Sequence, residues 1–323
     1  MNAKFNTLVI FSLIIMTTLS INSQEPRGGN SGSAERANEI LELARKAIYK
    51  DEKKRNVKSI FLSVSGNWYD KTTRYVGKDK PRQSEERMKF KREYSVTPPR
   101  FARVVHNVEP STANAEVPLK IEMTMVVNGD LVARSTDTFV NGQKLEVGKN
   151  PKLEELLTAQ GLPAKSPRAV ADSELQAEFF PLLLQDPVGN TLKFHYVGTA
   201  EADGRKADVL ELQPEETSTA PPVKQTVRYF FDSESHLLLL VTKDYSFEDI
   251  EKSTSTYFSA HQLMDGLLIP TKIKEESKVV SKKTIEFMGF RFTGSEQNKI
   301  TDLEINKFEI GREFPGKLFE IKK

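Results

Sequence analysis

Histidine is the residue best suited to acid–base or metal chemistry in this chain, and there are four among its 323 residues. They are His106, His195, His236 and His261, and no two stand at the spacing of a zinc-binding HxxxH or HExxH pair. Each lies in or beside a stretch typical of a β-strand, where an edge or surface position is the simpler interpretation. None of the four is therefore predicted to be functional.

The chain contains no cysteine. Disulfides, thiolate metal sites, cysteine nucleophiles and a lipid attached to an N-terminal cysteine are not expected on that ground. The motifs GxSxG, GxxxxGK[ST] and GxGxxG are absent from the sequence as well. The sequence therefore predicts no enzyme and no cofactor. An exported hydrolase is the weakest hypothesis, because no nucleophile, metal set or acid–base pair can be named.

An acidic run and a single tryptophan are further candidates for a binding site, but a structural role is the simpler interpretation of each. The acidic run DYSFEDIE, residues 244–251, lacks the glycine and alternating spacing of a calcium loop, so a solvated turn is favoured. Trp68 follows Gly66-Asn67 near the end of a predicted strand. It could contact a ligand, but a role as an anchor in the core is favoured.

Composition and charge indicate a soluble globular protein that does not bind nucleic acid. Hydrophobic residues make up 38% and charged residues 28% of the chain, both typical of globular domains. Lys and Arg total 47 against 45 acidic residues, for a net charge of +2. A dedicated nucleic-acid binder concentrates a large basic excess on one face. The basic run at residues 71–92 also contains acidic residues and is interpreted as a solvated hairpin or loop.

The amino terminus has the order of features of a secretory signal. Lys4 precedes an apolar stretch from Leu8 to Ile21, and Ser23 is a small residue at a plausible cleavage point. The stretch has about 14 residues, whereas a bilayer span needs about 20. We therefore expect a signal peptide at residues 1–23, a flexible segment at 24–32 and a single β domain, located in the periplasm, at 33–323. An uncleaved membrane anchor is the alternative.

The elements of this domain follow from hydrophobic periodicity. Apolar residues recur at helical spacing after Ser33, which predicts an amphipathic helix of about 17 residues. From residue 57 the period changes to two, as expected for strands with one buried face. Residues 118–148 predict a three-stranded meander, because the Asn-Gly pairs at 128–129 and 141–142 favour tight hairpin turns.

Residues 150–188 break the strand pattern. Leu153 to Leu157 suggest a short helix, Pro163 and Pro167 indicate a loop, and a second helical segment follows Leu175, where Pro181 is expected to kink or split it. Strand patterns then resume at short intervals, as in an antiparallel sheet. They cover residues 192–197, 206–212, 227–231, 236–244, 253–263, 269–277, 283–292 and 299–310.

Several of these late strands are apolar on both faces. The clearest are residues 229–231, residues 237–241, and the segment with Phe287, Phe290 and Phe292. A sheet with two apolar faces must be covered on both or must enclose something. What fills the second face is therefore the functional question.

Three segments resemble the periplasmic lipoprotein-carrier, or LolA/LolB-like, superfamily. They are PLLLQDPVGNTLKFHYVGTAEADGRKADVLEL at 181–212, VRYFFDSESHLLLLVTKDY at 227–245 and YFSAHQLMDGLLIPTKI at 257–273. The predicted amino-terminal helix before a first strand is similar to the opening of the same family. The resemblance covers most of the mature chain and is stronger after residue 180.

The resemblance implies a mainly β (α+β) fold: a strongly curved antiparallel sheet, an open half-barrel. An N-terminal helix and a lid helix within 150–188 would pack over its concave face. It implies a monomeric carrier of lipid or lipoprotein acyl chains, which would meet transfer partners at the inner and outer membranes. A non-catalytic structural or protein-binding β domain of the envelope is the alternative. The residues expected to line the cavity are Phe90, Met123, Met125, Phe179, Leu183, Phe230, Leu238 and Phe290.

Overall fold

The computed structural model describes residues 31–55, 57–75, 81–98, 100–110, 119–145, 167–185, 192–213, 224–247, 249–282, 285–287 and 290–321. Its helices are α1 (Ser31–Ile48), the 3₁₀-helix η2 (Glu52–Arg55), α3 (Pro167–Leu183) and the 3₁₀-helix η3 (Gly316–Phe319). The strands of the first half are β1 (Ile60–Tyr75), β2 (Arg82–Thr97), β3 (Phe101–Pro110), β4 (Leu119–Asn128), β5 (Leu131–Val140) and β6 (Gln143–Leu145). Those of the second half are β7 (Phe194–Ala202), β8 (Arg205–Leu212), β9 (Lys224–Asp232), β10 (Leu238–Phe247), β11 (Ile250–Met264), β12 (Leu267–Ser281), β13 (Ile285–Phe287), β14 (Phe290–Phe292) and β15 (Gly294–Ile310).

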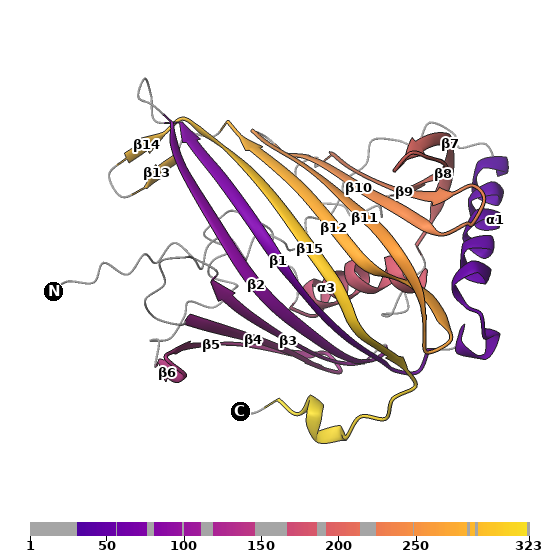
Figure 1. Ribbon diagram of the computed structural model, residues 1–323, viewed down its shortest axis with the longest axis horizontal. Helices are drawn as coiled ribbons and strands as arrows, with labels where there is room; N and C mark the ends of the chain where they lie inside the picture. Colours follow the sequence, from indigo (N-terminus) through magenta and orange to yellow (C-terminus); the bar gives the residue numbers. More distant parts are fainter. Residues whose placement is uncertain are drawn as a thin grey trace.

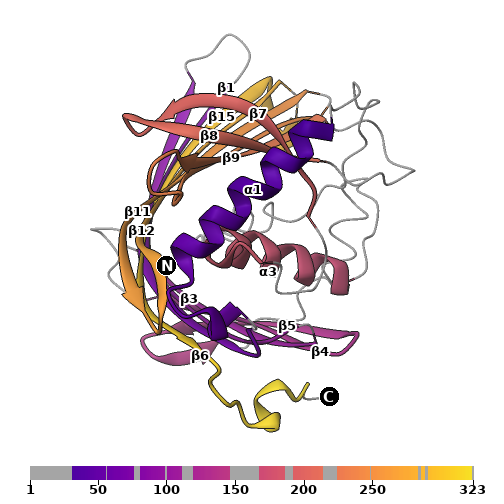
Figure 2. The same cartoon turned by 90° about the vertical axis from the view of Figure 1, so that its right-hand side faces the viewer.

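The strands form one 13-stranded antiparallel sheet in the order β6-β5-β4-β3-β2-β1-β15-β12-β11-β10-β9-β8-β7. Strands β1 to β6 make one wing and β7 to β12 the other, and the last strand, β15, lies between them. Within the described residues β6 and β7 each pair on one side alone, so the sheet curves without closing. Figure 2 shows the resulting open half-barrel. The predicted fold class is confirmed.

The two α-helices lie on the concave side of this sheet. Helix α3 lies inside the concavity, and α1 crosses one end of it against β7 (Figures 1 and 2). The predicted amphipathic face of α1 is buried, with Ala37, Ile40 and Ala44 at most 1% exposed. Ser33 in its first turn donates a hydrogen bond to the carbonyl oxygen of Tyr196 in β7, at 3.0 Å. Among the described residues, neither α-helix combines the length and hydrophobicity needed to span a bilayer.

The predicted meander is confirmed as β4, β5 and β6. At its second turn Asn141 and Gly142 both have positive φ, 51° and 76°, as the Asn-Gly signal requires. The first turn lies one residue later than its Asn-Gly pair suggests. Asn128 is the last residue of β4 and pairs with Leu131, so Gly129 and Asp130 form the turn.

The prediction for Pro167 was wrong, and of the two outcomes expected at Pro181, a kink or a split, the split was wrong. Pro167 does not belong to a loop, because α3 begins there. Proline is well tolerated in the first turn of a helix, where its missing N–H would have no intrahelical acceptor. Pro181 does not split the second segment, because α3 continues through it to Leu183. So close to the helix end, proline removes a single donor. The short helix expected near Leu153 lies outside the described residues.

Two strand predictions also need correction. Residues 283–292 were expected to form one strand of the main sheet. The described part instead forms β13 and β14, a short hairpin whose strands pair with each other in a separate two-stranded sheet. Strand β3 was not predicted at all, because its apolar residues do not alternate strictly. Paired on both sides, by β2 and β4, it is a central strand of the first wing.

Gly66 allows a close approach between the two long strands β1 and β15. A Cβ atom at this position would overlap the carbonyl oxygen of Asp302 in β15 and would lie 3.0 Å from Cζ of Phe90. The carbonyl belongs to the backbone of a strand paired on both sides and cannot move aside cheaply.

We therefore expect Gly66→Ala to lower the free energy of unfolding by about 1–3 kcal/mol, because the added methyl forces the β1–β15 pair apart. Chemical denaturation monitored by Trp68 fluorescence measures the change. Gly316→Ala is the matched control, since a Cβ atom there meets nothing within 4 Å. Equal stability of the two variants would contradict the packing argument.

Candidate binding site on the concave face

Strand register defines which side chains share the concave face. In β1 the alternate residues Leu62, Val64, Trp68 and Asp70 point to one face, and their partners in β2 and β15 share it. The strand ends next to α1 carry apolar residues on this face, which we call the apolar zone. Toward the opposite strand ends the same face carries charged residues, which we call the polar zone: Asp70, Glu86, Lys252, Glu275 and Lys299.

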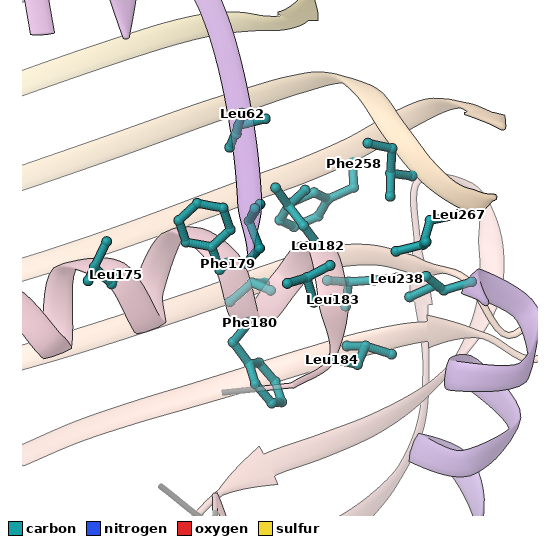
Figure 3. Packing of buried hydrophobic residues seen from close by; sticks show 14 of the residues in the cluster. Leu62, Leu175, Phe179, Phe180, Leu182, Leu183, Leu184, Leu238, Phe258 and Leu267 are labelled. Carbon is teal, nitrogen blue, oxygen red and sulfur yellow. The ribbon is translucent and has the colours of Figure 1, made fainter. Parts of the chain in front are cut away.

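The apolar zone is filled by the end of α3. All six residues from Phe179 to Leu184 are buried, and the five other than Pro181 are at most 3% exposed. Figure 3 shows Phe179, Leu182 and Leu183 lying among side chains of the sheet and its hairpins. The Phe179 ring meets Tyr94 of β2 edge-on, with centroids 5.3 Å apart. The α3 helix therefore occupies the place where the sequence predicted a hollow.

Aromatic and backbone contacts hold this end of α3. The Phe180 ring stacks on Phe194 and meets Tyr229 edge-on, at 5.6 and 5.5 Å between centroids. The hydroxyl of Tyr49, the residue after α1, donates to the Leu183 carbonyl, and Arg45 Nε in α1 donates to the Leu184 carbonyl, each at 3.0 Å. These bonds satisfy carbonyl groups that a helix end leaves without intrahelical partners.

Leu184 ends the helix in a left-handed conformation, with φ at 50°. This conformation favours glycine, and a leucine in it costs about 1–2 kcal/mol. Two ion pairs attach the more polar side of α3 to the first wing. Arg92 contacts Glu178 at 2.5 Å and Arg134 contacts Glu174 at 2.9 Å, and these side chains are partly exposed. Ion pairs of this kind stabilise a contact weakly.

A second, smaller apolar cluster lies further along the same strands. Trp68, Met88, Phe90 and Val108 are buried in it, with Leu303 packed against them. These residues come from β1, β2, β3 and β15 and share the concave face by register. This cluster separates the apolar zone from the polar zone.

The polar zone places charged groups where the curved sheet surrounds them. In the register of the sheet, Lys299 of β15 stands opposite Asp70 of β1 on one side and opposite Ser277 of β12 on the other. Its ammonium lies 4.9 Å from the centre of the Trp68 ring. Lys252 in β11 pairs with Val279 of β12, so the two lysines lie diagonally across β12.

Burial lowers the pKa of Lys252 and of Lys299, while the negative charge of Glu275 opposes that shift in both. Burial alone would lower the pKa of Arg92 too, but the nearby Tyr94 and Glu178 outweigh it and the pKa rises. The Arg92 side chain nevertheless keeps 23% of its surface exposed. Lys252 and Lys299 are thus half-buried, partly desolvated charges on the concave face.

His106 of β3 is the strand partner of Arg92, on the side of the second cluster that faces the apolar zone. Burial, and then the positive charges of Arg92 and Lys299, lower its pKa to about 2. Its ring meets Phe90 edge-on at 5.5 Å, and its Nε2 atom has no hydrogen-bond partner among the described residues. His106 is therefore a neutral interior residue. No cluster of metal-binding side chains occurs in the part of the chain that the structure describes.

The structure distributes the predicted lining residues over three clusters. Met125, Phe179, Leu183 and Leu238 lie together in the largest one, which fills the apolar zone. Phe90 and Met123 belong to the second cluster on the same face. These six share the concave side, although α3 itself contributes two of them.

The remaining two predicted residues lie elsewhere. Phe230 packs on the outer face of the sheet with Leu239 and Leu240, in a third cluster. Phe290 is in the short β14 strand, and its side chain lies outside what the structure describes. Sequence reasoning also missed the polar zone. One signal for it was present in β15, where Lys299 and Thr301 follow the same two-residue alternation as the apolar Leu303 and Ile305 and therefore share their face.

No protein-family profile and no curated protein sequence matches the chain. A comparison with solved structures finds a LolA superfamily protein from Nitrosomonas europaea, with 12% identity over 88% of this chain and 97% of that one, at a TM-score of 0.36. It also finds a DUF1329 family protein from Desulfovibrio piger, with 14% identity over 88% of this chain and 96% of that one, at a TM-score of 0.32. The first carries the name of the superfamily that the sequence resembles.

The buried neutral His106 predicts that the protein loses stability on acidification. The unfolded chain takes up a proton near the ordinary pKa of 6.5, whereas the folded chain does not until about 2. Stability therefore falls as pH drops below 6.5, by about 2 kcal/mol for this group between pH 6.5 and about pH 5. Denaturant titrations at the two pH values should show a smaller loss for His106→Gln than for the wild type. An unchanged loss in the variant would contradict the burial of a neutral imidazole.

Proposed function

We propose that the protein is a carrier of the cell envelope that binds acyl chains of a lipid or lipoprotein on the concave face of its sheet. The observation that carries the proposal is the filling of the apolar zone by one short segment, Phe179 to Leu184 of α3. Strands from both wings surround this segment. An acyl chain presents an apolar surface, as the end of the helix does. The predicted signal peptide at residues 1–23 supports a periplasmic location.

The energies of the two occupants are close. Burying a methylene contributes about 0.8 kcal/mol, so a chain of about 15 methylenes contributes about 12 kcal/mol. Returning the five large side chains of Phe179, Phe180 and Leu182–Leu184 to water costs about 1.5–3 kcal/mol each, or about 8–15 kcal/mol in all. An acyl chain can therefore replace the helix end at little net cost. The left-handed Leu184 and the weak ion pairs lower the cost of lifting α3 further.

In this scheme α3 is an occupant that alternates with cargo. The helix keeps the apolar zone away from water when no acyl chain is bound. Its return then expels the chain at the acceptor membrane, and the rate of this exchange sets the rate of release.

The alternative function is a structural or protein-binding β domain in which α3 never leaves. The near-zero exposure of Phe179 and Leu183 favours it, because a permanently filled core looks the same in a single state. The two functions differ in whether α3 must move, and that difference can be tested directly because the chain has no cysteine of its own.

Cysteines in place of Arg134 and Glu174, whose side chains contact each other at 2.9 Å, allow α3 to be tied to β5 by a bis-maleimide. We expect the cross-linked protein to lose binding of a fluorescent fatty acid. The same variant capped with N-ethylmaleimide should keep it. Fluorescence titration measures both. Equal binding by the two forms would show that cargo does not displace α3, and absence of binding in both would favour the structural alternative.

Removal of one α3 ion pair should instead strengthen cargo binding. Glu178→Gln breaks the contact with Arg92, and we expect acyl affinity to rise about two- to fivefold, since a partly exposed pair contributes about 0.5–1 kcal/mol. Glu309→Gln is the matched control, because it breaks contacts with Lys307 and Arg312 on the outer face. A fall in affinity for Glu178→Gln would mean that this carboxylate does not hold α3 against cargo.

A further inference from the structure

Lys252 and Lys299 in the polar zone lack the salt bridges that nearby lysines of the sheet form. On the outer face of β12, Lys274 pairs with Glu276 and Lys278 pairs with Glu296 of β15. On the concave face Lys252 and Lys299 form no salt bridge with any described carboxylate. Burial is the first cause of the lowered pKa in both. Desolvated ammonium groups without a close counter-ion are costly and mark places where an anion is welcome.

The carboxylates near the two lysines act on other cations as well or accept hydrogen bonds from other residues. Glu275 acts electrostatically on Arg92, Lys252 and Lys299 alike. Glu178 is already engaged with Arg92.

Asp70 also acts on Lys299, but its carboxylate accepts hydrogen bonds from Thr72 and Gln297. Lys243 of β10 pairs with Thr254 of β11 and adds a further positive charge beside Lys252. Glu86 of β2, the strand partner of Asp70, adds a further carboxylate on this face, and burial and the charge of Asp70 raise its pKa. No described carboxylate forms a salt bridge with Lys252 or Lys299, so an anion can bind between the two lysines without displacing one.

The positions of the lysines suit a single anionic group. Each repels the other, as the effect of Lys252 on the pKa of Lys299 shows. They lie on either side of β12. Ser277 of β12 is the strand partner of Lys299, and Thr254 is two residues from Lys252 in β11, with the two hydroxyls 3.3 Å apart. Strands are about 4.8 Å apart, so two long side chains two strands apart can reach one group between them. The hydroxyls add donors suited to a carboxylate or phosphate oxygen.

Apolar surface adjoins this place directly. Lys299 lies against the Trp68 ring, and Trp68 belongs to the second apolar cluster with Met88 and Phe90. A molecule that satisfies both features has an anionic end and a hydrocarbon part that continues toward the apolar zone.

We propose that the polar zone is a headgroup site, in which Lys252 and Lys299 bind the carboxylate or phosphate of an anionic amphiphile. The inference rests on the acyl-binding function proposed above and adds the class of cargo and its orientation. The charged end faces the strand ends far from α1, and the hydrocarbon chain runs past Trp68 to the place of α3.

The test compares ligands of equal chain length: a long-chain fatty acid, the alkyl phosphate and the neutral methyl ester. Wild-type protein should bind each anion about tenfold more tightly than the ester or better, as expected for charge-assisted hydrogen bonds. In Lys252→Gln/Lys299→Gln the preference should disappear while the ester binds as before. The control Lys272→Gln/Lys307→Gln removes two exposed lysines from the outer faces of β12 and β15 and should keep the preference. Thermal unfolding verifies that each variant is folded.

The outcomes separate this inference from the function on which it rests. Equal affinity of wild type for acid and ester overturns the headgroup site and leaves acyl binding intact, and so does a preference that survives in Lys252→Gln/Lys299→Gln. Absence of binding for every amphiphile overturns both. Inorganic phosphate is the last probe. If it binds to wild type alone and displaces no amphiphile, the anion site belongs to a free ion, and the headgroup assignment is wrong.

Discussion

The pairing of β15 with both β1 and β12 is the interaction on which the rest of the structure depends. This last long strand joins two wings that are otherwise separate antiparallel meanders, one from each half of the chain. Its register with β1 runs from Ile60↔Ile310 to Tyr75↔Gly294, with one irregularity at Ser63/Val64. Because β15 is central, residues from opposite ends of the chain meet on one curved face. Trp68 and Lys299 are such a pair.

The curvature that follows produces two chemically different ends on one continuous surface. Near α1 the face is apolar, and α3 fills it with aromatic and leucine side chains. Toward the other end, lysines and carboxylates are surrounded by sheet without close pairing. A flat sheet would leave these charges in bulk water, where they would cost little and recognise little. The concave shape therefore turns ordinary strand residues into a desolvated site.

The sequence predicted what local signals determine. The meander at 118–148 and helix α1 depend on turn residues and short-range periodicity, and both were found. The position of β15 depends on contacts across the whole chain, which no local pattern shows. Phe230 was expected on the concave face but lies on the outer face. The register shift between Leu238 and Leu240 changes which side chains of the β9–β10 pair share a face. A strand apolar on both faces offers no internal check on that choice.

The polar zone escaped prediction for a different reason. Strand β11 carries polar residues on both faces, so Lys252 looks like any solvated lysine until β12 and β15 are placed beside it. The candidate site could thus be predicted at its apolar end alone, where residues such as Met125 and Phe179 stand out by type. Burial of a charge is a property of the assembled sheet.

The unpaired edges at β6 and β7 have a mechanical consequence. A closed barrel has a diameter dictated by its strand number and stagger. Here the wings meet along β15 only, and across the described residues no ladder of hydrogen bonds joins their far edges. Strand pairing therefore does not fix the width of the trough between the two wings. Moving the wings apart breaks no strand pair. Under the proposed carrier function, such a trough would accept cargoes of different width, with one acyl chain or several, between the same strands.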